Sequence, residues 1–112
     1  MTEKLGSATL ATNSSTVYRD LLEVDFPAWA QGLSFRLKEN NTNNVKYKIQ
    51  GTLDEVNYED IQTETALNKN AATYKTPSVN IKLCDPWISV RVQILTASGT
   101  SHGNVTAVAI AQ

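Results

Sequence analysis

The residues of this chain that carry reactive or metal-binding groups are few and widely spaced. His102 lies in a Ser/Gly/Thr-rich stretch between two apolar segments, and Cys84, the single cysteine, precedes an Asp-Pro pair. A zinc site needs three or four converging nitrogen, sulfur or carboxylate ligands, which one histidine and one distant cysteine do not supply. Cys84 has no basic neighbour that would favour its thiolate. We therefore expect a half-buried structural cysteine, an exposed loop histidine and no enzyme activity.

The densest group of carboxylates surrounds Asn57 and consists of Asp54, Glu55, Glu59 and Asp60. Calcium takes six to eight oxygen ligands, and an Asp/Asn-rich turn offers several of them. The spacing lacks the glycine bend of a calcium-binding loop, so a solvated turn is the favoured interpretation. A glycosidase pair would also need one carboxyl group with a raised pKa, which such a polar turn does not provide. We expect neither a metal nor a cofactor.

Four aromatic residues, Trp29, Tyr58, Tyr74 and Trp87, could stack on a sugar. Their contexts differ, because Tyr58 and Trp87 begin strand-like segments whereas Trp29 lies in the Pro27–Gly32 connection. Packing in a core or an interface is the commoner role of such residues. Sugar binding stays open as an alternative.

Length and charge indicate one domain without a nucleic-acid role. The chain has 112 residues, 41% of them hydrophobic, with 10 basic and 11 acidic residues and a net charge of −1. Binding to nucleic acid depends on clustered Lys and Arg, and beyond Lys46 and Lys48 none is clustered. The N-terminal residues are polar, and no apolar run has the length of a membrane span. We expect a chain made in a reducing cytoplasm, with no membrane partner.

The elements that would position these residues are strands. Apolar and polar residues alternate with a period of two, as in strands with one buried face, and turn signals recur every eight to twelve residues. The alternating segments are 16–26, 33–38, 45–53, 58–62, 79–83, 87–94 and 105–111. The sequence therefore predicts an all-β domain over residues 15–112. We expect a single antiparallel β-sandwich of seven or eight strands, of jelly-roll or immunoglobulin-like size.

Connections and termini yield further expectations. The Asn-rich turn at 40–44 predicts a hairpin between its flanking strands, and the loop that contains His102 predicts a second one. Residues 63–78, rich in Thr, Asn, Lys and Ala, are typical of a long loop. Residues 1–14 are expected to form a flexible N-terminal arm that is disordered alone or ordered only against a partner.

Two motifs carry a family resemblance, which covers residues 45–112 best. The segment 51–61 (GTLDEVNYEDI) is followed by 87–92 (WISVRV) and by a terminal Val/Ala-rich strand. This arrangement resembles the small β-sandwich virion proteins of tailed bacteriophages, in which a G-S-x-D-G-x-N-W-like turn precedes such a strand. Tyr58 stands where tryptophan is usual and Glu55 where glycine is usual. Glutamate disfavours the positive φ angles that glycine permits.

The resemblance implies a capsid decoration (cement) protein or a head fibre, placed on the capsid surface of a virion. Its implied partners are the major capsid protein and neighbouring copies of itself, as a homotrimer. Two alternatives stay open: a carbohydrate- or receptor-binding fibre module that exposes Trp29, Tyr58 or Tyr74, and a tail or neck accessory protein. The candidate contacts with the capsid or another partner are Leu5, Leu10, Phe26, Trp29, Leu67 and Tyr74.

Overall fold

The computed structural model describes residues 2–11, 17–40, 45–67, 81–82, 87–96 and 103–112. These residues form eight strands, and the all-β prediction is confirmed. Among the described residues there is no helix that could cross a membrane. The strands are β1 (Glu3–Ala11), β2 (Arg19–Asp25), β3 (Gly32–Asn40), β4 (Val45–Thr52), β5 (Tyr58–Ala66), β6 (Ile81–Lys82), β7 (Ser89–Thr96) and β8 (Asn104–Ala111).

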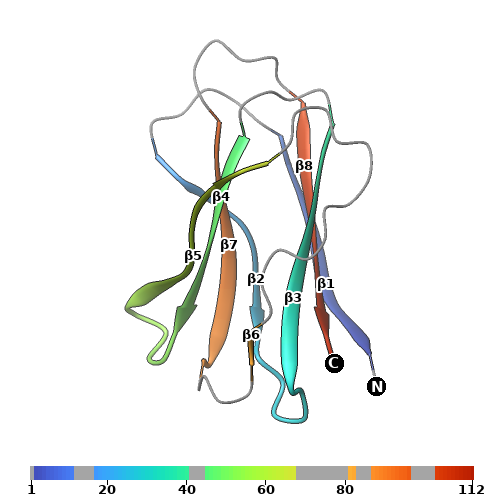
Figure 1. Ribbon diagram of the computed structural model, residues 1–112, viewed down its shortest axis with the longest axis vertical. Helices are drawn as coiled ribbons and strands as arrows, with labels where there is room; N and C mark the ends of the chain where they lie inside the picture. The colour runs from blue at the N-terminus through green and yellow to red at the C-terminus, as the bar shows by residue number, and fades with distance from the viewer. Residues whose placement is uncertain (1, 12–16, 41–44, 68–80, 83–86, 97–102) are drawn as a thin grey trace.

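The strands form two four-stranded sheets that pack face to face (Figure 1). Sheet A has the order β1-β8-β3-β6 and sheet B the order β2-β7-β4-β5, and each neighbouring pair is antiparallel. Eight strands in this interleaved order make a jelly roll. Consecutive strands lie in different sheets at every step except the one from β4 to β5, which stays within sheet B.

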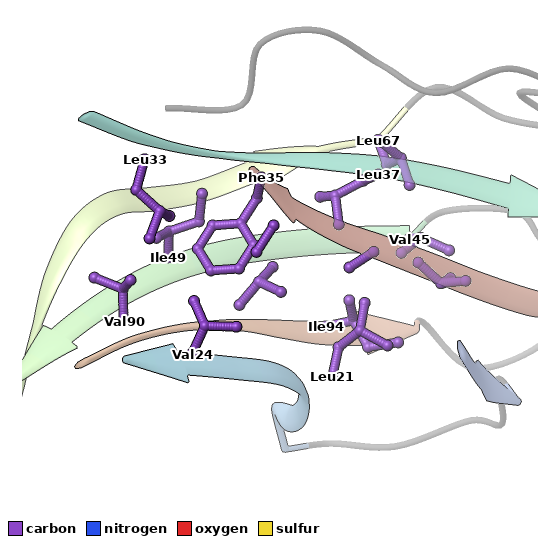
Figure 2. Packing of buried hydrophobic residues seen from close by; sticks show 14 residues of the cluster. Leu21, Val24, Leu33, Phe35, Leu37, Val45, Ile49, Leu67, Val90 and Ile94 are labelled. Atoms are coloured by element: carbon purple, nitrogen blue, oxygen red, sulfur yellow. The ribbon is translucent and has the colours of Figure 1, made fainter. Parts of the chain in front are cut away.

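The core lies between the two sheets (Figure 2). Strand β8 alternates buried and half-buried residues along its length, as expected of a strand with one face on the core. Its buried side chains are small, so the bulky residues of β3 and of sheet B fill most of the space. The largest fully buried hydrophobic side chains are Leu33, Phe35, Leu37, Val45, Ile49, Val90, Val92, Ile94 and Val105.

The two expected hairpins are wrong, because in each case the two strands lie in different sheets. Strand β3 belongs to sheet A and β4 to sheet B, and the same holds for β8 and β7. An alternating pattern fixes which face of a strand is buried but not whether the next strand lies beside it or opposite it. The apolar faces of these strands pack against each other across the core instead of forming one continuous sheet. The expected placement of the C-terminal segment in a sheet is confirmed, since β8 pairs with both β1 and β3.

Strand β2 contains a β-bulge that the alternation did not predict. Its register with β7 shifts between Asp20 and Leu22, so Leu21 is the extra residue. A bulge places two residues of one strand opposite one residue of its partner. Leu21 is consequently buried together with Val24, whereas Leu22 packs against the core only in part.

The expected flexible arm is corrected over Glu3–Ala11, which form strand β1. This strand pairs with β8 along its length, with one register shift between Lys4 and Gly6. Leu5, Ala8 and Leu10 are partly buried against the core, so the short apolar alternation of this segment is that of an edge strand. The expected boundary at residue 14 lies outside the described residues.

The loop expected at 63–78 begins later than predicted. Strand β5 continues to Ala66, and Leu67 is buried in the core. The backbone N–H of Leu67 donates a hydrogen bond to the Val45 carbonyl at 2.8 Å, which fixes the chain at the start of β4. The rest of the expected loop lies outside the described residues.

Candidate functional site: three surfaces of the sandwich

The turn between β4 and β5 is organised by one carboxylate, that of Asp54. Its Oδ1 accepts hydrogen bonds from the backbone N–H groups of Val56 and Asn57, and its Oδ2 accepts one from the Asn57 side chain. These donors, led by the Asn57 N–H, lower the pKa of Asp54 to about 2. Both carboxylate oxygens of Asp54 thus accept hydrogen bonds from residues of the same turn. Within the described residues no group of three His, Cys, Asp or Glu side chains could hold a metal ion.

Exposed hydrophobic side chains gather at the end of the sandwich that carries this turn. Phe26 donates a backbone hydrogen bond to Ile88, and Ile88 donates one to Thr52, so the ends of β2 and β4 lie beside the start of β7. We call Trp29, Leu53, Val56 and Ile88 the apolar end; these residues are 41%, 50%, 75% and 44% exposed. They are four of the five large, exposed hydrophobic residues in the described part of the chain. The fifth, Val17, precedes β2 at the opposite end.

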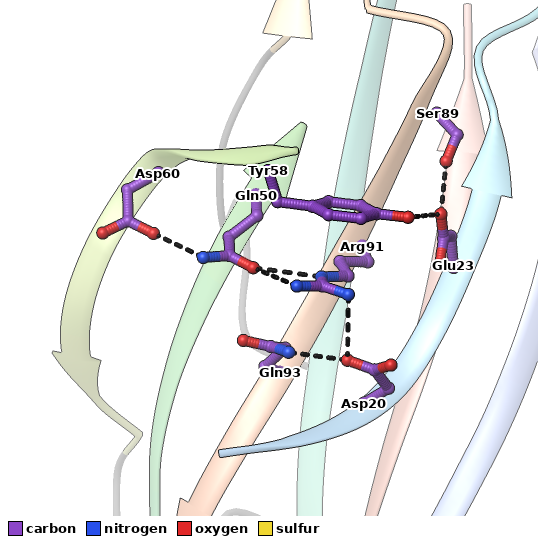
Figure 3. A network of polar contacts seen from close by, with 8 residues as sticks. All are labelled: Asp20, Glu23, Gln50, Tyr58, Asp60, Ser89, Arg91 and Gln93. Atoms are coloured by element: carbon purple, nitrogen blue, oxygen red, sulfur yellow. Dashed lines mark hydrogen bonds and ion pairs between the residues drawn. The ribbon is translucent and has the colours of Figure 1, made fainter. Parts of the chain in front are cut away.

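A second surface is the outer face of sheet B, where a network of polar side chains joins all four strands (Figure 3). The Arg91 guanidinium lies over the Tyr58 ring, 3.5 Å from its centroid. Tyr58 extends from edge strand β5 and donates its hydroxyl to Glu23 on the other edge strand, β2, at 2.7 Å. This hydrogen bond to a carboxylate raises the pKa of Tyr58. The tyrosine therefore bridges the whole width of the sheet.

A second tyrosine crosses the same face in the opposite direction. Tyr18, next to β2, donates its hydroxyl to Glu64 on β5, and the Lys48 ammonium lies 4.5 Å from its ring centroid. Burial, followed by the hydrogen bond to Glu64, raises the pKa of Tyr18. The bonds from Tyr18 and Lys46 lower the pKa of Glu64. Each tyrosine is thus paired with a cation from a central strand and a carboxylate from the far edge.

Amide side chains connect the centre of the network. Gln50 accepts hydrogen bonds from Nε and Nη2 of Arg91 at 3.0 and 2.8 Å, and it donates one to Asp60. Gln93 donates to Asp20, whose carboxylate also lies 3.6 Å from Nη1 of Arg91. The polar groups of this network bind one another and so connect the four strands of sheet B.

The third surface, the outer face of sheet A, is built from short polar side chains, two aliphatic ones and three cations. On β8 the outward residues are Thr106, Val108 and Ile110, all half-buried, while the residues between them face the core. The Thr9 and Thr106 hydroxyls are joined by a hydrogen bond of 2.9 Å.

The structure separates the candidate contact residues. Trp29 is exposed, whereas Leu5, Leu10 and Phe26 are partly buried against the core and Leu67 is buried within it. Leu67 therefore offers no surface to a partner. Tyr74, Cys84 and His102 lie outside the described residues. Of the other aromatic residues, Trp87 packs against the core and Tyr58 belongs to the polar network.

Three members of the apolar end were missed from the sequence. Leu53 and Val56 flank Asp54 and Glu55 in the turn, and apolar residues inside a polar turn were the available signal. Ile88 has the position of a buried residue in the alternating segment 87–94, but β7 begins only at Ser89. The residue that packs against Gly51 is Trp87 and not Ile88.

No family model and no curated protein matches the sequence. Among solved structures, the chain aligns over 99% of its length with 32% of a chain in the crystal structure of the infectious bursal disease virus VP2 subviral particle, at 11% identity and a TM-score of 0.52. It covers 32% of a chain in the structure of the Gt strain of this virus (12% identity, TM-score 0.50) and 31% of one in the Gx strain (12%, 0.49). The chain thus spans about a third of these proteins, and the likeness is one of fold.

Proposed function

We propose that this protein is a structural component of a virus particle that binds the outer surface of the capsid and stabilises it. The jelly roll is a fold of viral capsid and lectin domains, and the similar solved chains come from structures of a virus and of a subviral particle. A fold alone does not determine a function, so the argument depends on the surface of this chain.

The observation that carries the proposal is the apolar end. Four large hydrophobic side chains are exposed on loops at one end of the sandwich, and such a patch marks an interaction site in a soluble protein. Burial of one of these side chains contributes roughly 1.5–3 kcal/mol. Where many copies bind a symmetric shell, such modest contacts add up across the particle. We therefore place the capsid contact at Trp29 and its neighbours, not on Leu5 and Leu10.

Co-sedimentation with purified capsids of a tailed bacteriophage tests the proposal. We expect the wild-type protein to bind expanded capsids saturably and Trp29→Ser combined with Val56→Ser to lose most of this binding. The matched control is Val17→Ser, which removes an equally exposed hydrophobic side chain (63%) at the opposite end and should bind as the wild type does.

Circular dichroism establishes that the variants are folded. If folded wild-type protein does not bind capsids, or if Val17→Ser weakens binding as much as the double variant, the proposed role of the apolar end is wrong. Deletion of residues 1–14 is not a clean test, because it would remove strand β1 and expose the edge of β8.

Carbohydrate binding is the second candidate, and the observation that favours it is the exposed Trp29 side chain, since aromatic faces stack on sugars. Tyr58 is less suited because Arg91 already covers one face of its ring. A glycan array separates the candidates: a sugar site would fail with Trp29→Ser alone and tolerate Val56→Ser, whereas capsid binding should decline with each.

A further inference from the structure

The outer face of sheet A carries positive charge in an ordered pattern. Opposed residues of β3, β8 and β1 form three rows across the sheet, and residues directly opposite each other share a face. Among the nine residues there are three cations and no carboxylate. The rows, which we call the basic face, are Lys38-Thr106-Thr9, Arg36-Val108-Ser7 and Ser34-Ile110-Lys4.

The outer face of sheet B carries the opposite charge. Five carboxylates point outward from its strands, against three cations on the same face: Asp20, Glu23, Asp25, Asp60 and Glu64 against Lys46, Lys48 and Arg91. The Arg91 side chain is 19% exposed and that of its partner Asp20 is 57% exposed, whereas the side chains of Lys46 and Glu64 are both 48% exposed. We call this surface the acidic face. The net charge of −1 for the whole chain hides this separation.

Two charged residues along β3 and two along β2 have the same spacing and opposite charges. Arg36 and Lys38 are alternate residues of β3, and Glu23 and Asp25 are alternate residues of β2. Alternate residues of a strand lie on one face, about 6–7 Å apart. The two cations of β3 in one copy can therefore lie opposite the two carboxylates of β2 in another copy, without a change in either backbone.

We infer that the basic face of one copy of this chain binds the acidic face of a second copy. The two sheets pack by their inner faces (Figure 1), so their outer faces point in opposite directions and the contact is head to tail. Such a contact leaves one face free at each end, and repeated addition gives a ring or an open stack. The occupant is a second copy because both complementary faces belong to the same molecule and are present at equal concentration. This contact does not use the apolar end and does not depend on the proposed capsid binding.

Two charge-reversal variants test the contact. The basic-face variant is Arg36→Glu with Lys38→Glu, and the acidic-face variant is Asp20→Lys with Asp25→Lys. Glu23 is kept because it accepts hydrogen bonds from both Tyr58 and Ser89. Asp20 also accepts a hydrogen bond from Gln93 and pairs with Arg91, so circular dichroism first establishes that the acidic-face variant is folded. The matched control for the acidic-face variant is Glu55→Lys with Glu59→Lys, which makes the same change in net charge as that variant at two exposed residues that lie off both faces.

Sedimentation velocity over a concentration series up to about 1 mM, at ionic strengths of roughly 0.02 M and 0.5 M, gives the readout. We expect the sedimentation coefficient of the wild-type protein to rise with concentration at low salt. At high salt it should keep the value of a monomer at every concentration. Each face variant should be monomeric alone, because its two faces then carry the same sign. An equimolar mixture of the two should associate again, and the control should behave as the wild type does.

Three outcomes would overturn the inference. Wild-type protein that is monomeric at every concentration at low salt has no such contact. Association that the mixture of variants does not restore uses a different surface. Loss of association in the control equal to that in the acidic-face variant would show an effect of net charge instead of the two faces.

Discussion

Glu55 adopts a left-handed backbone conformation, with a φ angle of 64°, in the turn between β4 and β5. This conformation brings the Cβ of an L-residue close to the backbone and costs roughly 1–2 kcal/mol, which glycine avoids. The hydrogen bonds that Asp54 accepts from the same turn hold Glu55 in place despite the strain.

We expect Glu55→Gly to raise the free energy of unfolding by about 0.5–1 kcal/mol, after allowance for the greater freedom of glycine in the unfolded chain. Urea denaturation measures the change. Glu59→Gly, in the extended backbone of β5, is the control and should lower stability by about 0.5–1 kcal/mol. Equal losses in both variants would contradict the assignment of strain to Glu55.

Gly51 is required by a close contact and not by its backbone angles. A Cβ atom at this position would lie 2.5 Å from Cδ2 of Trp87 and 2.6 Å from Cε3, well inside van der Waals contact. The indole ring therefore packs directly on the backbone of β4. In the sequence, Gly51 is visible only as a break in an alternating pattern. Its contact with Trp87 could not be predicted, because Trp87 is 36 residues away and precedes a different strand, β7.

Gly51→Ala should lower the free energy of unfolding by about 1–3 kcal/mol through overpacking and should shift the tryptophan fluorescence of the folded state. Gly6→Ala is the matched control, since its Cβ would meet Val24 at an ordinary 3.6 Å and should leave stability unchanged or slightly higher. If both changes are tolerated alike, the contact between Trp87 and β4 is not as close as described.

At the scale of elements, strand β7 shows how far an alternating pattern can be used. It is a central strand of sheet B, and its residues 90, 92 and 94 are buried while Arg91 and Gln93 belong to the outer network. The alternation predicted these two faces correctly. It could not predict the bulge in β2, because an extra residue leaves no mark in a period-two pattern until the register is known.

Val90→Asp should lower the free energy of unfolding by about 3 kcal/mol or more, because it buries a charge without a partner. Arg91→Ala should cost about 1 kcal/mol, from the lost hydrogen bonds to Gln50 and the contact with Tyr58. Chemical denaturation of the two variants makes the comparison, and near-equal losses would mean that the faces of β7 are assigned incorrectly.

At the scale of the whole molecule, the sequence predicted the class of the fold but not its connections. Buried residues such as Phe35 and Ile49 were found from alternation alone, since burial depends on one strand at a time. The pairing of β1 with β8, and the network that joins Asp20 to Gln93, depend on residues far apart in sequence. For the same reason Trp29 was recognised as a candidate contact, whereas the apolar end as a surface was not.

The interleaved strand order also determines when each sheet can form during synthesis. Among the paired strands that the structure describes, only β4 and β5 are consecutive in the chain. Strand β1 ends at Ala11 and its partner β8 begins at Asn104, so at about 5–20 residues per second β1 waits on the order of 5–20 s after it leaves the ribosome. Sheet A thus assembles late, and the β4–β5 hairpin is the part of this sandwich that a growing chain can fold first.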